Sequence, residues 1–364
     1  MAKLKEYNGH YCESEYEYAF IGFLEVEGWE YISGNNIQRI NKRDVLIADD
    51  FQKFISDTNP ELTEDEVIQI FDNVRLVGAE SDFATLHKVY GWIVDGIQFT
   101  LQDGTVKMVS LIDFENPGNN IFHVVNQFTV EYTNNRQKEN RRPDVLLFVN
   151  GMPLCVIELK NPADAHATVY DAWEQITIRY WRDIPHLLHY CPLACISDGV
   201  KTRLGTVRTP YEHFYAWRRV NDGDQVSTLP FAETETMIKG VYSPERFLEI
   251  FRDYIYFQDS IYDSAEVEIV CRYPQFFASK LLKQSIANSV VTKSGKGGTY
   301  FGATGCGKTY TMAFLARQLA LRCSNIPEIG SPTIILIVDR EELQKQGAKL
   351  FTKSKDFLNL GEVS

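Results

Sequence analysis

The feature that most constrains this sequence is a glycine-rich octapeptide at residues 302–309, Gly-Ala-Thr-Gly-Cys-Gly-Lys-Thr. It matches the pattern G-x-x-x-x-G-K-[ST], in which glycines let backbone amides surround phosphate oxygens at the start of a helix. The lysine of this pattern reaches the β- and γ-phosphates, and the last hydroxyl binds Mg²⁺. Residues 298–301 can form the preceding strand and residues 308–322 the following helix. The motif therefore predicts a strand–loop–helix unit that binds ATP.

Residues on both sides of this loop extend the pattern. Gln275, upstream, could hydrogen-bond the edge of an adenine base, although a surface glutamine would look the same. Downstream, residues 334–338 predict a buried strand, and with Asp339-Arg340 they resemble motif Ia of superfamily 2 helicases. Together these features resemble the front of a RecA-like motor domain. The candidate nucleotide-binding residues are Gly302, Thr304, Gly305, Cys306, Gly307, Lys308, Thr309 and Gln275.

No acidic Asp-Glu-x-x motif follows before the sequence ends at Ser364. That motif would hold Mg²⁺ and position the attacking water, and no arginine finger is available. We therefore expect residues 245–364 to be the incomplete first part of a motor domain, and the chain to be a fragment of a longer protein. Such a fragment should bind nucleotide poorly and hardly hydrolyse it. DNA-stimulated ATPase activity of this chain alone would contradict that expectation.

The first 240 residues show other periodicities. Apolar residues at helical spacing between Tyr16 and Leu24 predict a helix that ends at Gly28, and Thr63 with Glu66 predicts a capping box. Later alternation predicts strands and one long helix. The expected strands are 98–101, 106–112, 123–130, 145–149, 154–159 and 193–196, and the helix is 167–182. Polar residues around 222–245 predict a linker, which divides the chain into domains 1–244 and 245–364.

A second motif lies between two of these strands. Arg142-Pro-Asp144 precedes one apolar run, and Glu158-Leu-Lys160 ends the next. This is the P-D…E-x-K pattern, in which two carboxylates bind a divalent cation and a lysine positions or deprotonates the attacking water. Glu158 and Lys160 are two apart and share one face of a strand. An exposed strand with alternating charges explains the spacing equally well, but charges that end buried strands require partners or a metal.

The register of the intervening hairpin tests this pattern. A two-residue loop at Asn150-Gly151 would place Asp144 opposite Ile157, whereas a three-residue loop at 150–152 would place it opposite Glu158. Pro153 cannot donate a ladder hydrogen bond and suits a loop edge. We therefore predict the longer loop.

The overall charge of −12 argues at first against nucleic acid as a partner. Residues 241–364, however, hold 15 Lys and Arg against 13 Asp and Glu, a net of +2, which leaves −14 on residues 1–240. Some of these acidic residues could form a metal site. The longest apolar runs are far too short for a membrane span, the acidic first 20 residues exclude a secretory leader, and seven scattered cysteines indicate reduced thiols in a cytoplasmic protein.

Residues 111–162 carry a specific resemblance. This stretch, which includes Arg-Pro-Asp-Val-Leu-Leu-Phe-Val-Asn-Gly-Met-Pro-Leu-Cys-Val-Ile-Glu-Leu-Lys, closely resembles the N-terminal nuclease domain of the R subunit of type I restriction–modification enzymes. That family places a superfamily 2 motor directly after the nuclease. The resemblance implies an α/β fold, a PD-(D/E)xK restriction-endonuclease-like domain followed by the beginning of a RecA-like P-loop domain. It also implies Mg²⁺ and ATP as cofactors, cutting of double-stranded DNA remote from the recognition sequence, and methylase (M) and specificity (S) subunits as partners.

The same resemblance implies site residues. Asp144 and Glu158 would be the metal ligands and Lys160 the catalytic lysine, and a glutamate of the first helix would join them. Glu17 fits best and Glu15 is the fallback. The family also carries a Q-x-x-x-Y motif on the following helix, for which Gln175 and Tyr180 are the candidates. Their spacing is one residue too long, and on a straight α-helix positions i and i+5 do not share a face, which argues against Tyr180.

Two other interpretations stay open. The chain could be an ATP switch without nuclease activity, whose acidic half is an interaction module. It could also belong to a single-polypeptide nuclease–helicase of DNA repair or type III restriction. Loss of cleavage with translocation retained in Asp144→Ala or Lys160→Ala distinguishes the first from a nuclease, and neighbouring methylase and specificity genes distinguish the second.

Overall fold

A computed structural model describes residues 13–78, 80–161, 168–227, 229, 231–259, 266–303, 305–321, 323, 326–327, 329–330 and 332–337. The chain divides into two compact units, Met1–Leu248 and Glu249–Ser364, close to the boundary predicted at residue 244. Each unit is described separately below.

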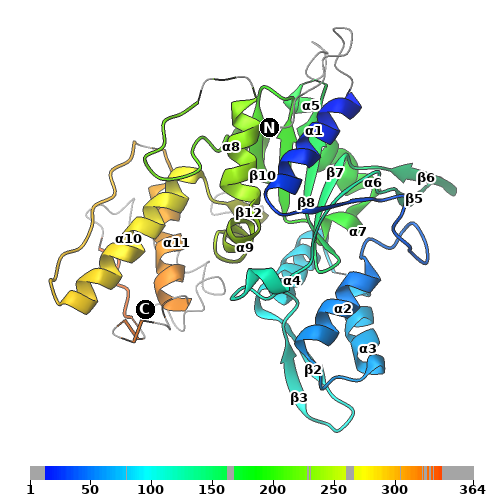
Figure 1. The fold of residues 1–364 in the computed structure, drawn as a ribbon, viewed down its shortest axis with the longest axis horizontal. Helices are drawn as coiled ribbons and strands as arrows, with labels where there is room; N and C mark the ends of the chain where they lie inside the picture. The colour runs from blue at the N-terminus through cyan, green and yellow to red at the C-terminus, as the bar shows by residue number, and fades with distance from the viewer. Residues whose placement is uncertain are drawn as a thin grey trace. The chain divides into compact units, whose positions relative to one another are not determined.

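The first unit is built on a six-stranded mixed sheet in the order β1-β4-β7-β8-β9-β10 (Figure 1). The pairs β1–β4 and β8–β9 are parallel, and the others are antiparallel. The strands are β1 (Glu30–Ser33), β4 (Phe122–Asn126), β7 (Val145–Val149), β8 (Met152–Leu159), β9 (Leu193–Ser197) and β10 (Thr202–Thr206). Every residue of β7, β8 and β9 is buried, as expected for strands covered on both faces. The observed architecture is therefore mixed α/β, with its core at these three strands.

The hairpin between β7 and β8 has a shorter loop than the one predicted. Val149 pairs with Met152, so the loop has two residues, Asn150 and Gly151, both with positive φ. That conformation favours Asn-Gly, and a Cβ on Gly151 would lie 2.2 Å from the carbonyl oxygen of Ile47. The predicted three-residue loop at 150–152 is wrong.

A β-bulge nevertheless restores the register that the longer loop was meant to give. Phe148 pairs with Pro153 but Leu147 pairs with Cys155, so one residue of β8 is left unpaired. Beyond the bulge Val145 pairs with Ile157, and the next opposed positions are Asp144 and Glu158. The expected juxtaposition of the two carboxylates is therefore present, but a bulge produces it.

Helices pack around this sheet. Helix α1 (Glu13–Val26) contacts β1, β4 and β8, and α5 (Val169–Glu174) contacts β8 and β9. The capping box predicted at Thr63 and Glu66 opens α3, with both reciprocal hydrogen bonds present. The remaining helices of the unit are α2 (Ala48–Thr58), α3 (Glu64–Arg75), α4 (Asp82–Asp95), η1 (Pro117–Asn119), η2 (Gln175–Tyr180), α6 (Trp181–Asp183), α7 (Pro185–Leu188), η3 (Tyr211–His213), α8 (Ala232–Met237) and η4 (Ile238–Tyr242), and α9 (Pro244–Asp253) spans the boundary.

Two hairpins complete the first unit. They are β2 (Ile97–Thr100) with β3 (Val106–Val109), and β5 (Val130–Asn134) with β6 (Gln137–Arg141). The sequence predicted the first hairpin but not the second, because β5 and β6 are short and consist largely of polar residues. Strand β6 leads directly into the Arg-Pro-Asp motif.

The second unit consists of the hairpin β11 (Ile255–Asp259) and β12 (Glu266–Val270) and the helices α10 (Tyr273–Thr292) and α11 (Lys308–Leu321). The two helices lie side by side (Figure 1). Tyr254 packs between Phe276 and Phe314, with ring centroids 4.9 and 5.3 Å away. Helix α11 begins at Lys308, so the helix predicted after the glycine-rich loop is confirmed.

The two strands predicted around that loop do not form. Residues 298–301 have no regular structure, and the side chain of Phe301 is 94% exposed. Residues 334–337 are likewise irregular, and Ile335 and Ile337 are largely exposed, while Val338 and Asp339-Arg340 lie outside the described residues. A buried parallel strand requires neighbours on both sides, and the described part of this unit offers only the β11–β12 hairpin.

None of the helices in the described ranges combines the length and apolar character that a membrane crossing requires.

Candidate active site

Asp144, Glu158 and Lys160 meet where β7 begins and β8 ends. Oδ2 of Asp144 accepts a hydrogen bond from the backbone amide of Leu159 at 2.7 Å, which fixes its carboxylate beside Glu158. The Glu158 side chain is fully buried, and its Oε2 lies 3.9 Å from Nζ of Lys160. The pattern predicted from sequence is therefore one spatial cluster, and two strands of the central sheet hold it in place.

The electrostatics of this cluster are unfavourable for two negative charges. Burial, reinforced by the neighbouring carboxylate of Asp144, raises the pKa of Glu158 well above its ordinary value. Burial also raises the pKa of Asp144, although the Leu159 amide and Lys160 oppose that shift. Within the described residues, Oε2 of Glu158 is buried and has no hydrogen-bond partner. A buried oxygen without a partner is costly.

Gln175 and Tyr180 join the cluster through four connected contacts. Nζ of Lys160 donates to Oε1 of Gln175 at 3.1 Å, and Nε2 of Gln175 donates to the Tyr180 hydroxyl at 2.9 Å. That hydroxyl donates to Oε1 of Glu158 at 2.5 Å. The ion pair between Glu158 and Lys160 closes the ring.

Tyr180, a candidate whose spacing is one residue too long for the motif, reaches the cluster because the helix is not a regular α-helix there. Residues Gln175–Tyr180 form one turn of π-helix, η2, between α5 and α6. A π-helix has i→i+5 hydrogen bonds, so it places positions 175 and 180 on one face. The extra residue relative to the Q-x-x-x-Y pattern is absorbed in this turn. Sequence reasoning that assumed an α-helical period had no means of finding it.

Glu17 reaches the neighbourhood of this cluster from α1, whereas Glu15 is exposed to solvent. Oε1 of Glu17 accepts a hydrogen bond from Nδ2 of Asn126 at 2.6 Å. Burial and the charge of Asp144 raise the pKa of Glu17. The structure thus favours Glu17 over the fallback Glu15. Sequence reasoning missed Asn126, although an amide at the end of an apolar strand was a usable signal.

The described residues contain no group of three or more His, Cys, Asp or Glu arranged to hold a metal ion, so Glu17 does not complete a three-carboxylate cluster. Asp144 and Glu158 alone still fit a divalent cation. They present paired carboxylates, and Oε2 of Glu158, which lacks a hydrogen-bond partner in the described part of the chain, is an oxygen that a cation would satisfy. Mg²⁺ is commonly held by one or two carboxylates and retains several waters.

The glycine-rich loop has a different geometry. Lys308 is exposed, and its Nζ donates to the carbonyl oxygens of Gly302 and Ala303 at 2.8 and 2.9 Å. Gly305 and Gly307 have positive φ, which suits glycine. Of the other predicted residues, Cys306 and Thr309 are partly exposed, and Thr304 lies outside the described residues. The lysine side chain therefore contacts the backbone of the loop that is predicted to bind the phosphates of ATP.

Gln275 is buried against this loop. Its Oε1 accepts from the backbone amide of Arg272 at 2.8 Å, and its Nε2 donates to the carbonyl oxygen of Gly307 at 3.1 Å. A Cβ on Gly307 would lie 2.3 Å from that Nε2. The structure therefore places Gln275 with the predicted nucleotide-binding residues, in contact with the loop backbone.

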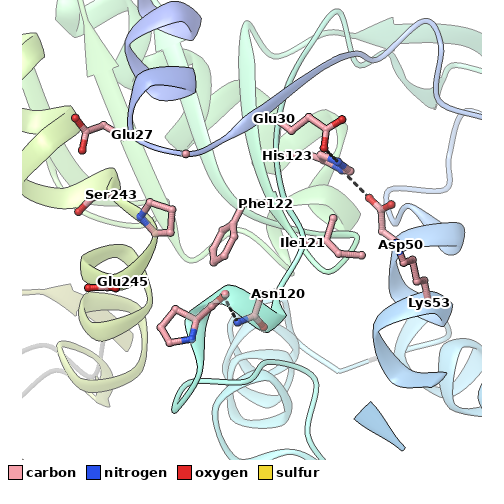
Figure 2. A pocket seen from close by; sticks show the side chains of 14 residues that line it. Glu27, Glu30, Asp50, Lys53, Asn120, Ile121, Phe122, His123, Ser243 and Glu245 are labelled. Atoms are coloured by element: carbon pink, nitrogen blue, oxygen red, sulfur yellow. Dashed lines mark hydrogen bonds and ion pairs between the residues drawn. The ribbon is translucent and has the colours of Figure 1, made fainter. Parts of the chain in front are cut away.

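A separate pocket of about 760 Å³ opens at the other end of β4. Figure 2 shows the imidazole of His123 there, between the carboxylates of Glu30 and Asp50. Nδ1 of His123 lies 2.8 Å from Asp50, and Nε2 lies 3.4 Å from Glu30. These contacts tie α2 to β1 and β4. The predicted carboxylates do not line this pocket.

Comparison with known families matches both units. Residues 11–213 match the family described as Type I restriction enzyme R protein N terminus (HSDR_N). Residues 274–360 match the family described as SWI2/SNF2 ATPase.

Individual relatives agree with these matches. The chain is 29% identical to the Type I restriction enzyme HindI endonuclease subunit of Haemophilus influenzae, over 95% of this chain and 33% of that protein. It is 29% identical to the putative type I restriction enzyme MjaIXP endonuclease subunit of Methanocaldococcus jannaschii, over 92% of this chain and 34% of the relative. The chain thus spans about a third of the length of these relatives. Because the first family covers more than half of the sequence, the chain belongs to the type I restriction enzyme R protein N-terminal family.

Proposed function

We propose that this chain supplies the DNA-cutting site of an ATP-dependent type I restriction endonuclease and the first part of its motor. The observation that carries the proposal is the cluster of Asp144, Glu158 and Lys160, in which Oε2 of Glu158 has no hydrogen-bond partner among the described residues and lies 3.9 Å from the lysine ammonium. On this view the first unit has the PD-(D/E)xK fold, and residues 245–364 begin a RecA-like domain.

The two carboxylates would hold Mg²⁺. Bound there, Mg²⁺ supplies positive charge to the phosphate oxygens and lowers the pKa of a water. Its binding would also relieve the like-charge repulsion between Asp144 and Glu158, whose pKa values are raised in the metal-free chain. The cost of keeping both groups ionised in a buried site would thus be offset when the cation binds.

The residues around the carboxylates orient the reacting groups. Tyr180 occupies Oε1 of Glu158 and leaves Oε2 for the cation. Gln175 holds the ammonium of Lys160 at the edge of the cluster, where it can hold a water and offset developing negative charge. Lys160 is thus the proposed catalytic lysine, while Gln175 and Tyr180 are positioning residues. Glu17, on α1, would add negative charge near the pair, because the charge of Asp144 already contributes to its raised pKa.

The second unit would bind ATP at the glycine-rich loop. Lys308 would exchange its two carbonyl partners for the β- and γ-phosphates, and Thr309 would contact Mg²⁺. In the complete enzyme, ATP hydrolysis would move double-stranded DNA toward the nuclease, which would cut remote from the recognition sequence. Methylase and specificity subunits would supply target recognition. These activities are proposed for the whole enzyme, because the chain spans a third of its relatives.

The test is cleavage by the complete enzyme assembled with its methylase and specificity subunits. Asp144→Ala and Lys160→Ala should each reduce DNA cleavage by at least about 10²-fold, because each removes a group that acts on the metal or the water. ATP-driven translocation should be unchanged. Lys138→Ala is the matched control, because that lysine is exposed and pairs only with Glu131 among the described residues. Cleavage that survives in both variants would show that the acidic unit is not a nuclease.

A further inference from the structure

Arg142 differs from the other arginines around the candidate site. Arg141 binds Asp183 through Nε and Nη2, Arg182 binds the same carboxylate, and Arg179 pairs with Glu174 at 2.6 Å. Arg142 is exposed and makes no hydrogen bond or ion pair with any residue that the structure describes. Its guanidinium is therefore available for a ligand, and it belongs to a residue two positions from Asp144.

Arg142 stands two residues before Asp144, in the short connection between β6 and β7. A residue before proline is restricted to extended conformations. Arg142 precedes Pro143, and the chain then bends at Asp144, so the arginine side chain leaves the backbone two residues from that carboxylate. The electrostatics agree, because the positive charge of Arg142 acts to lower the pKa of both Asp144 and Glu17 against the effect of burial.

The chemistry of the substrate requires such a cation. A phosphodiester brought to Asp144, Glu158 and Glu17 meets three carboxyl groups, and the nearest lysine, Lys160, is already bonded to Gln175. A guanidinium presents a planar fork of donors that matches two phosphate oxygens. It also stays charged throughout the physiological pH range.

We propose that Arg142 binds a backbone phosphate of the cut DNA strand beside the scissile bond and positions that strand on Asp144 and Glu158. The inference rests on the proposed nuclease function and adds a substrate-binding residue to it. Arg142 acts on the DNA backbone without reading its sequence, so its contribution is electrostatic and sensitive to salt.

The experiment measures single-turnover cleavage by the complete enzyme at salt concentrations between about 50 and 200 mM. Over this range the binding energy from phosphate contacts falls strongly as salt increases. Arg142→Ala should slow cleavage about 10- to 100-fold at low salt, as expected for loss of a charged hydrogen bond. Its rate should also depend less on salt than that of the unmodified enzyme. Arg142→Lys should recover part of the rate, because the charge returns without the fork. Arg179→Ala, which removes an exposed but paired arginine, should change neither rate nor salt dependence.

The outcomes separate two failures. If Asp144→Ala abolishes cleavage while Arg142→Ala stays within twofold of the unmodified enzyme, the role of Arg142 is wrong and the proposed function stands. If Asp144→Ala cleaves normally, the proposed function itself fails. A slow Arg142→Ala enzyme with unchanged salt dependence and a lowered melting temperature would indicate a structural role and would also overturn the inference.

Discussion

The carboxylate cluster and the phosphate loop satisfy their charged groups in opposite ways. Glu158 is fully buried in β8, and it is held by Tyr180 from η2 and by Lys160 at the end of its own strand. Lys308 is exposed, and its only described partners are two carbonyl groups of its own loop. The cluster is thus assembled by tertiary structure from segments far apart in sequence, whereas the loop is a local structure.

This difference has an energetic consequence. Glu158 and Tyr180 are buried, and Lys160 and Gln175 are partly buried, so removal of one group leaves another unsatisfied at a cost of about 1–3 kcal/mol. An exposed lysine that loses two carbonyl contacts exchanges them for water at little cost. The cluster should therefore be formed before its ligand arrives, while the loop should gain most of its order from the ligand.

The largest expected effect comes from Tyr180→Phe, which removes the donor to Oε1 of Glu158. We expect the free energy of unfolding of the first unit to fall by about 1–3 kcal/mol, because a buried carboxyl group loses its hydrogen bond. All five tryptophans lie between residues 29 and 217. Urea unfolding followed by tryptophan fluorescence therefore reports on this unit alone.

Tyr190→Phe provides the control for that variant. Tyr190 is also buried, and its hydroxyl donates to the neutral carbonyl oxygen of Val74 at 2.7 Å. Loss of the Tyr180 hydroxyl also leaves Nε2 of Gln175 without its acceptor, whereas loss of the Tyr190 hydroxyl affects only the Val74 carbonyl. A loss in Tyr180→Phe no greater than that in Tyr190→Phe would contradict the special status of the cluster.

The second prediction concerns pH in the absence of metal. The pKa values of Glu17, Asp144 and Glu158 are all raised, with burial the first cause. For a carboxyl group whose folded pKa is raised, the stabilisation is complete below the unfolded pKa of about 4 and is lost as pH rises through the folded pKa. The unfolding free energy of the first unit should therefore decline as pH rises above the unfolded pKa of about 4. The unfolding free energy should fall by up to about 1.4 kcal/mol per pH unit for each carboxyl group that is protonated only in the folded state.

Two comparisons isolate the cluster in this experiment. Glu158→Gln should flatten the decline, because an amide cannot ionise, and millimolar Mg²⁺ should oppose it in the unmodified chain by binding the ionised pair. His123, whose pKa is also raised, contributes a loss of the same sign above about pH 6.5. A decline as steep in Glu158→Gln as in the unmodified chain would assign the effect to Glu17, Asp144 or His123 and not to Glu158.

The same contrast explains what the sequence could predict. Strand β7 and the capping box of α3 agree with prediction, because each depends on local pattern and burial. The loop length of the β7–β8 hairpin was predicted wrongly, because a three-residue loop and a two-residue loop with a bulge give the same register at Asp144. The strand expected at 298–301, and the described part of the one expected at 334–338, did not form because a buried strand depends on neighbours that a local pattern does not contain.

The candidate site was predictable to a similar extent. The identities of Asp144, Glu158 and Lys160 followed from the motif, and the structure brings them together. The place of Tyr180 did not follow, because one π-helical turn changes which residues share a face. The surroundings of Asn126 and Arg142 depend on where distant segments lie. Residue types could therefore be predicted, but the hydrogen-bond network could not.

The smallest expected effect completes the comparison with two matched lysine substitutions. Lys308→Ala should change the unfolding free energy of the second unit by less than about 0.5 kcal/mol, as is usual for exposed residues, when unfolding is followed by far-UV circular dichroism. Lys160→Ala should cost the first unit more, because Oε1 of Gln175 and the Glu158 carboxyl group both lose a partner. Any rise in melting temperature that ATP and Mg²⁺ produce should vanish in Lys308→Ala and persist in Lys160→Ala. If Lys308→Ala destabilised the chain as much as Lys160→Ala, the loop would be as fully formed as the cluster, and the distinction between a preformed and a ligand-ordered site would be lost.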